Sequence, residues 1–264
     1  MRLLDAILDR IGLFVARVIQ KETSGYQPFT PSDPETLKRC LQPGDVLLVE
    51  GNQKLSAAIK YLTQSTWSHA ALYVGDACAA PQADGERPCL VEAILGAGVI
   101  AVPLSKYRTY NTRICRPVGL TGEDREAVIA FALSRLGQKY DTRNIFDLAR
   151  YLFPTPPVPT RWRRRLIALG SGEPTRTICS TLIAQAFQSV RYPILPLVSQ
   201  PGDPHPRVGS RYSTREILHI RHYSLFAPRD FDVSPFFAIV KPTIEGGFDY
   251  KALNWGEADE SGSS

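Results

Sequence analysis

The sequence has little of the material on which several common classes of enzyme depend. Its 264 residues include only five cysteines, and no two of them form a Cys-x-x-Cys pair. The spacing therefore indicates neither a disulfide framework nor a four-thiolate zinc site. The patterns GxSxG and HExxH are absent, as is GxxxxGK followed by Ser or Thr. Nothing therefore points to a serine α/β-hydrolase, a zinc-dependent peptidase or a P-loop protein.

Long apolar runs are also absent. None approaches the roughly 18–20 residues that a helix needs to cross a bilayer. Asp5, Asp9 and Arg10 interrupt the region that would be apolar in a secretory signal peptide. We therefore expect a reducing, cytoplasmic setting in which the cysteines are free thiols.

The charge balance is mild, with 31 Lys and Arg against 26 Asp and Glu and a formal net charge of +5. It does not argue for a nucleic-acid or anionic-lipid partner, and we expect no nucleic acid to bind. Trp162 lies among Arg161 and Arg163–Arg165. We interpret this cluster as a solvated basic face, because one aromatic residue is not a stacking platform. The sequence leaves the oligomeric state open.

Residues 3–21 predict an amphipathic helix, because apolar residues recur at alternating spacings of three and four. They are Leu4, Ile7, Ile11, Phe14 and Val18. We interpret this helix as packed on the domain or on a second copy of the chain. The alternative is that residues 1–21 lie on a membrane surface. We expect residues 1–30 to be this helix and a linker, 31–250 one domain, and 251–264 a polar tail.

Short apolar runs at close spacing predict an antiparallel sheet in a single α+β domain. Strands are expected over 45–49, 68–74, 90–95, 99–104, 113–118 and 236–240. Helices are expected over 55–63, 142–152 and 178–190, and after a Thr121 N-cap with Leu136 on its apolar stripe. The proline-rich residues 193–206 predict a long loop.

Two attractive patterns are set aside. Residues 96–101 match the dinucleotide fingerprint GxGxxA, but Val99, Ile100 and Val102 favour a strand where a helix would have to hold the pyrophosphate. His219 and His222 could share one face of a helix, but no Cys or carboxylate lies near them at ligand spacing. We interpret them as ordinary surface or core histidines.

Cys179 is the first candidate for chemistry. It lies in the first turn of the predicted helix 178–190, which Thr175 or Thr177 would cap. Unpaired N–H groups and partial positive charge at a helix N-terminus stabilise a thiolate, the reactive form of cysteine. Taken alone, Cys179 is more often a small buried apolar residue.

His69 is the second candidate. Strand alternation places His69, Ala71 and Tyr73 on one face of the sheet. A side chain at a fixed strand position makes a better base than one on a loop. His69 and Cys179 are 110 positions apart in the sequence, so only the fold can bring them together.

Several short motifs in order resemble one family. They are Gly44-Asp-Val-Leu-Leu48, Trp67-Ser-His-Ala-Ala-Leu-Tyr-Val-Gly75, Val91-Glu-Ala93, Gly137-Gln-Lys-Tyr-Asp141, Ile178-Cys-Ser-Thr-Leu182 and Ala227-Pro-Arg-Asp-Phe-Asp232. Over roughly residues 42–242 the sequence resembles the YiiX/YebB-like (lipo-like) branch of the NlpC-type superfamily. These proteins are circularly permuted papain-fold cysteine hydrolases. The resemblance implies a small antiparallel sheet packed against a helix that carries the nucleophilic cysteine.

The resemblance also implies roles for individual residues. Cys179 would be the nucleophile, His69 the base, and Glu92 the polar side chain that orients the imidazole. Tyr140 matches the family tyrosine, and we expect it to line the substrate cleft. The sequence departs from many relatives in having Ile178 where they have Asp, and Glu92 where they often have His, Asn or Gln.

The expected chemistry is cleavage of an amide bond in a small peptide-like substrate through an acyl-thioester, with no metal or cofactor. One alternative is a lipid acyl hydrolase or acyltransferase similar to lecithin–retinol acyltransferase-like proteins. Residues 1–21 and the Trp162 cluster would then face a membrane. The second alternative is a non-enzymatic binding module on the same fold.

Overall fold

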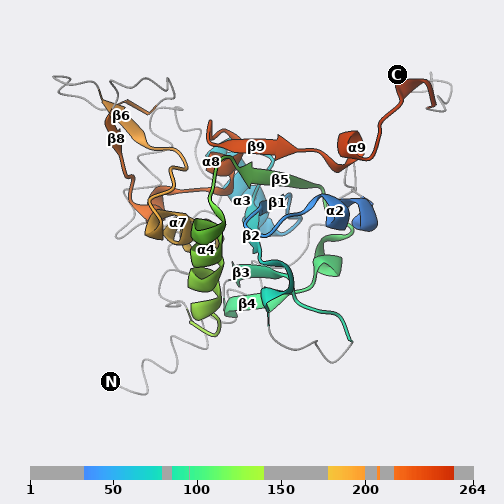
Figure 1. The fold of residues 1–264 in the computed structure, drawn as a ribbon, viewed down its shortest axis with the longest axis horizontal. Helices are drawn as coiled ribbons and strands as arrows, with labels where there is room; N and C mark the ends of the chain where they lie inside the picture. Colours follow the sequence, from blue (N-terminus) through green and yellow to red (C-terminus); the bar gives the residue numbers. More distant parts are fainter. Residues whose placement is uncertain are drawn as a thin grey trace.

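Six strands form one antiparallel sheet (Figure 1). The computed structural model describes residues 33–78, 85–94, 96–139, 178–199, 207–208 and 217–252. The strand order in the sheet is β4-β3-β2-β1-β5-β9. The strands are β1 (Val46–Val49), β2 (His69–Tyr73), β3 (Leu90–Ile94), β4 (Gly98–Val102), β5 (Thr112–Pro117) and β9 (Phe237–Val240). The predicted antiparallel sheet is thus confirmed, with strand bounds within one or two residues of those expected.

Helices and short turns cover both faces of this sheet. The helices are α2 (Pro34–Cys40), α3 (Lys54–Thr63), α4 (Gly122–Ser134), α7 (Ile178–Ser189), α8 (Pro228–Asp232) and α9 (Pro242–Glu245). The single turns are η1 (Gly75–Ala77), η2 (Leu104–Tyr107), η4 (Tyr223–Leu225) and η5 (Tyr250–Ala252). Helix α7 contacts β2, β3 and α4, and α4 and α7 lie side by side in Figure 1. Helix α2 contacts η2 and α9.

Alternation along the strands divides the core into two layers. Ala70 and Leu72 of β2 pack in the cluster that contains Phe187 of α7. Ala71, between them, packs in the cluster that contains Tyr107 of η2. The side chain of His69, two positions before Ala71, therefore belongs to the face that η2 covers, and the shared face of these two residues is as predicted.

The second, three-stranded sheet was not expected. It has the order β7-β6-β8, formed by β6 (Leu197–Ser199), β7 (Arg207–Val208) and β8 (Ile217–His219). The prediction of a continuous loop over 193–206 is therefore wrong, since β6 lies within it. His219 ends β8 and is exposed, as is His222, which agrees with their interpretation as ordinary histidines. Strands of two or three residues are too short to give a periodic signal.

The helix after Thr121 begins as predicted. The Asp124 N–H donates to Thr121 Oγ1 at 3.1 Å, which caps the first turn. The helix ends at Ser134, so Leu136 lies beyond it and is 39% exposed. The expectation that Leu136 belongs to the apolar stripe is therefore wrong. The strand interpretation of residues 98–102 is confirmed, so GxGxxA is not a phosphate-binding turn here.

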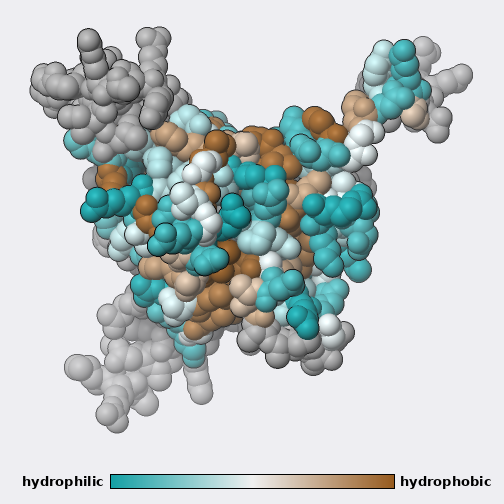
Figure 2. Space-filling view, in the orientation of Figure 1, coloured by the Kyte–Doolittle hydropathy of each residue, from teal (hydrophilic) through white to brown (hydrophobic). Residues whose placement is uncertain are grey.

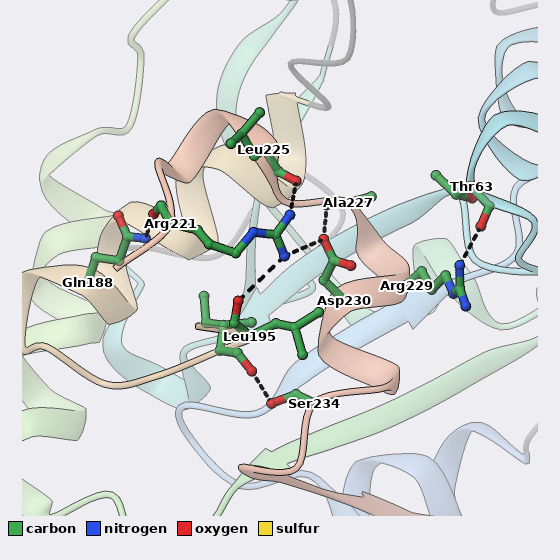
Figure 3. Close-up of polar contacts among 10 residues, drawn as sticks. Thr63, Gln188, Leu195, Arg221, Leu225, Ala227, Arg229, Asp230 and Ser234 are labelled. Atoms are coloured by element: carbon green, nitrogen blue, oxygen red, sulfur yellow. Dashed lines mark hydrogen bonds and ion pairs between the residues drawn. The ribbon is translucent and has the colours of Figure 1, made fainter. Parts of the chain in front are cut away.

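A polar cluster holds the segment after β8 against the end of α7 (Figure 3). Gln188 Nε2 on α7 donates to the Arg221 carbonyl at 2.6 Å. The Arg221 guanidinium donates to the Leu225 carbonyl at 3.2 Å and lies 4.0 Å from Asp230 Oδ2. Asp230 in turn accepts the Ala227 N–H at 3.0 Å. These contacts fix the position of α7, the helix that carries Cys179.

The large apolar side chains that stay exposed are spread over the described surface. Val118, Ile220, Ile244 and Tyr250 are each at least 60% exposed. On the face viewed in Figure 2, hydrophilic residues are interspersed among apolar ones, which is ordinary for a protein surface. Among the described helices, none has the length and apolar character that crossing a bilayer requires.

Two glycines, one at the start of β4 and one after α4, have nearly the same backbone angle but different surroundings. Gly98 has φ +79° and Gly137 has φ +80°. A Cβ on Gly98 would lie 2.2 Å from the Gln138 carbonyl oxygen, whereas a Cβ on Gly137 meets nothing within 4 Å. We expect Gly137→Ala to lower the free energy of unfolding by about 1 kcal/mol through the backbone alone. Gly98→Ala should cost roughly 1–3 kcal/mol more because of the overlap.

Urea unfolding of the two variants measures this difference directly. Equal losses of stability would contradict the close approach of Gly98 to Gln138.

Candidate active site

His69 and Glu92 meet on one face of the sheet. His69 is the first residue of β2, and Glu92 is the central residue of the neighbouring strand β3. The two atoms His69 Nε2 and Glu92 Oε2 lie 2.6 Å apart. The Glu92 side chain is fully buried, whereas that of His69 is 21% exposed. The carboxylate therefore holds the imidazole in one orientation and faces its Nε2 atom.

Glu92 has two further donors, both from η2. Lys106 Nζ contacts Oε1, and the Tyr107 hydroxyl donates to Oε2. Burial and the neighbouring Glu92 raise the pKa of Tyr107 well above its usual value, so its hydroxyl keeps its proton. Sequence reasoning missed both residues. The only signal was indirect: a glutamate in a buried strand must have partners, and His69 alone had been identified.

Cys179 is the second residue of α7 and is buried, with 3% of its surface exposed. Its thiol hydrogen-bonds the His69 side chain and also accepts the Ala70 backbone N–H. Ser180 Oγ lies 3.9 Å from the sulfur. The structure thus brings together the three residues that the resemblance singled out as nucleophile, base and orienting group.

The hydrogen bond from Ala70 has its origin in the sheet. The Val74 N–H donates to the Cys89 carbonyl on the β3 side, and alternation turns the Ala70 N–H to the same side. The β2–β3 pairing includes only Leu72 with Val91 and Tyr73 with Leu90. The Ala70 N–H therefore lies beyond the end of the paired region, where it meets the sulfur at the start of α7.

The electrostatics favour a charged pair of sulfur and imidazole. Burial alone would lower the pKa of His69, but the negative charges of Cys179 and Glu92, with their hydrogen bonds, raise it to about 10. Burial would raise the pKa of Cys179, but the charge and hydrogen bonds of His69 hold it below the usual value of a thiol. Burial also opposes ionisation of Glu92, yet His69 and then Lys106 lower its pKa to about 2. The site therefore favours a carboxylate at Glu92, an imidazolium at His69 and ionisation of the Cys179 thiol more than that of an ordinary cysteine.

The pKa values of three other thiols are shifted in the opposite direction, upward. Burial raises the pKa of Cys78, Cys89 and Cys115. They are therefore poor nucleophiles at neutral pH, and they provide internal references for the reactivity of Cys179.

Several predicted features lie outside the described residues. They are Tyr140, Thr175, Thr177, the helices over 3–21 and 142–152, the Trp162 cluster and the polar tail from residue 253. The assignment of Tyr140 to the cleft, the domain bounds and the membrane contact of residues 1–21 stay predictions. Within the described ranges, no three His, Cys, Asp or Glu side chains are grouped so as to hold a metal ion.

Comparison with known proteins finds a family that resembles the first part of the chain. Residues 40–152 match the model of the permuted papain-like amidase enzymes, the YaeF/YiiX or C92 family. This part of the chain is similar to the permuted papain-like amidases. The matched residues include His69, Glu92 and Tyr140, and Cys179 lies beyond them. The predicted resemblance and the permuted papain-like α+β fold are confirmed, as is, in general terms, a hydrolase of the amidase type.

The chain was also compared with curated proteins and with solved structures. A search of curated proteins finds no match. Among solved structures, the crystal structure of the metalloprotein yiiX from Escherichia coli O157:H7 matches with 15% sequence identity and a TM-score of 0.43. The match covers 76% of this chain and 97% of that one.

Thiol labelling tests whether His69 activates Cys179. A thiol with a lowered pKa stays ionised at pH values where an ordinary thiol is protonated, so iodoacetamide should still label Cys179 at pH 6. Cys78 and Cys89, whose pKa values are raised, should label only as the pH becomes alkaline. In His69→Ala the Cys179 pKa should rise, and labelling at pH 6 should slow by roughly tenfold or more.

Peptide mapping by mass spectrometry measures each cysteine separately. If Cys179 has the same pH profile in the wild type and in His69→Ala, the ion pair is not what sets its reactivity.

Proposed function

We propose that this protein is a cysteine amidase that cleaves a small peptide-like amide through an acyl-thioester on Cys179. The observation that carries the proposal is the contact of one buried thiol with a histidine that a buried glutamate orients. A binding module on the same fold would have no use for an ionised thiol held beside an imidazolium. The amidase family whose model matches residues 40–152 supports an amide as the bond that is cleaved.

The first half of the reaction acylates the enzyme. The Cys179 thiolate attacks the amide carbonyl carbon, and the carbonyl oxygen becomes an oxyanion. Backbone N–H groups at the start of α7 are suited to stabilise this charge, because the first turn of a helix has no internal acceptors for them. His69 then donates its proton to the amide nitrogen, the C–N bond breaks, and the amine leaves.

The second half releases the acyl group. His69, now neutral, takes a proton from a water molecule, and the resulting hydroxide attacks the thioester carbonyl. The C–S bond breaks, the product leaves as a carboxylic acid, and the thiolate and imidazolium are restored. Because Glu92 occupies Nε2, the nitrogen that exchanges this proton is Nδ1. Apart from the substrate and this water molecule, every group used in these steps belongs to the chain.

The lipid alternative depends on a different part of the chain. It needs residues 1–21 and the Trp162 cluster to contact a membrane, and both lie outside the described residues. The amide proposal depends only on the described site, so it is the one we retain. Release of fatty acid from phospholipid vesicles, lost on deletion of residues 1–21, would favour the lipid alternative.

Double-mutant kinetics test the mechanism. On a peptide-like amide substrate found by screening, Cys179→Ala and His69→Ala should each lower kcat/KM by roughly 1,000-fold or more. The double variant should lose little beyond either single variant, because nucleophile and base act as one unit. Losses that multiply would contradict the pair.

Trapping of the intermediate gives an independent measurement. Rapid acid quenching and mass spectrometry should find the substrate acyl group on the peptide that contains Cys179. Turnover by the wild type with no such adduct, together with an active Cys179→Ala variant, would overturn the proposed function.

A further inference from the structure

Lys106 contacts the active site from a turn that the mechanism above does not use. It lies in η2, directly after β4 and Pro103. Its ammonium group contacts Glu92 Oε1, the carboxylate oxygen that His69 leaves unoccupied. Its side chain is 35% exposed, whereas that of Glu92 is fully buried. Lys106 thus reaches from the surface to a buried carboxylate.

The charges around Glu92 show what this contact can supply. The described groups that face the site are His69 from β2, Lys106 and Tyr107 from η2, and Cys179 from α7. Thiolate, imidazolium and carboxylate together carry one net negative charge. An uncompensated charge in a buried site is costly. The ammonium group of Lys106 brings the sum to zero.

Tyr107 cannot replace Lys106 in this role. Its hydroxyl donates to Oε2, the same oxygen that His69 contacts, but it carries no charge. Its ring lies 6.1 Å from the His69 ring, between centroids, and the Lys106 ammonium lies 5.1 Å from the centre of the Tyr107 ring. Tyr107 therefore packs near both cationic groups but, being neutral, leaves the charge balance to Lys106.

We propose that Lys106 is a positioning residue of the catalytic network, which holds Glu92 ionised and aligned through Oε1 so that Oε2 orients His69. The inference rests on the proposed function, since it takes Cys179 and His69 as the reacting pair. Lys106 contacts Glu92 and not the sulfur. Its effect reaches the thiolate through the charge of Glu92 and the orientation of His69.

The sign of the effect follows from the charges. Removal of the Lys106 cation leaves the Glu92 charge uncompensated near the thiolate, so the thiolate becomes less favourable. The midpoint of Cys179 labelling should therefore move to higher pH in Lys106→Met, by about one pH unit. Labelling at pH 6 should slow by roughly tenfold. Lys106→Arg keeps the charge and should restore a profile close to that of the wild type.

Two control variants separate charge from packing. Tyr107→Phe removes a neutral donor from the same carboxylate and should shift the labelling midpoint less than Lys106→Met. Lys60→Met removes a lysine that pairs with a different buried carboxylate, Glu50, at 3.2 Å. This change should leave the Cys179 profile unmoved. Urea unfolding of each variant shows whether the fold is intact at the pH values used.

The outcomes are distinct. A Lys106→Met profile that superimposes on that of the wild type, with or without lower stability, would mean that Lys106 only anchors η2 and would overturn the inference. A shift that Lys106→Arg does not reverse would also overturn it, since the charge would not be the cause. A wild-type midpoint like that of Cys78 would overturn the proposed function, and this inference with it. The labelling needs no substrate, so the first two results leave the proposed function standing.

Discussion

The structure around the site depends on one buried carboxylate. Glu92 lies in the middle of a central strand with no exposed surface, where an unpaired charge would cost several kcal/mol. Its two oxygens can be satisfied only if donors come to them, and His69, Lys106 and Tyr107 do so from two separate elements. The requirement to pair Glu92 therefore fixes the turn η2 over the sheet and the orientation of the histidine at the same time.

The sheet also contacts helix α7 at the place where strands β2 and β3 stop pairing. Pairing between β2 and β3 stops at Leu72 and Val91, although β1 and β2 remain paired as far as Val49 and His69. The unpaired end leaves the Ala70 N–H for the Cys179 sulfur. Helix α7 keeps its position because its far end is held by the Arg221 and Asp230 cluster. The position of the Cys179 thiol therefore depends on contacts at both ends of α7.

Much of this could be predicted from local pattern. Alternation located the strands that carry His69 and Glu92, and the Ser/Thr-type cap at Thr121 located the start of α4. Position at a helix start singled out Cys179. What local pattern could not predict is set by contacts between distant segments. In the sequence, Lys106 has no feature that distinguishes it from a surface lysine; only the pairing of β3 with β4 brings it to Glu92. The strand at Leu197–Ser199 is too short and too close to prolines to give a periodic signal.

The two departures from the family pattern have one electrostatic explanation. A glutamate as the orienting residue carries a full negative charge, whereas a His, Asn or Gln in that place is neutral or nearly so. The charge stabilises the imidazolium strongly, which a weakly polar partner cannot do, but it also opposes the thiolate nearby. An aspartate at position 178 would add a second negative charge one residue before Cys179 in the sequence. With Ile178 there and Lys106 against Glu92, the four charges of the site sum to zero. A charged orienting group is then compatible with the ionised nucleophile that we propose.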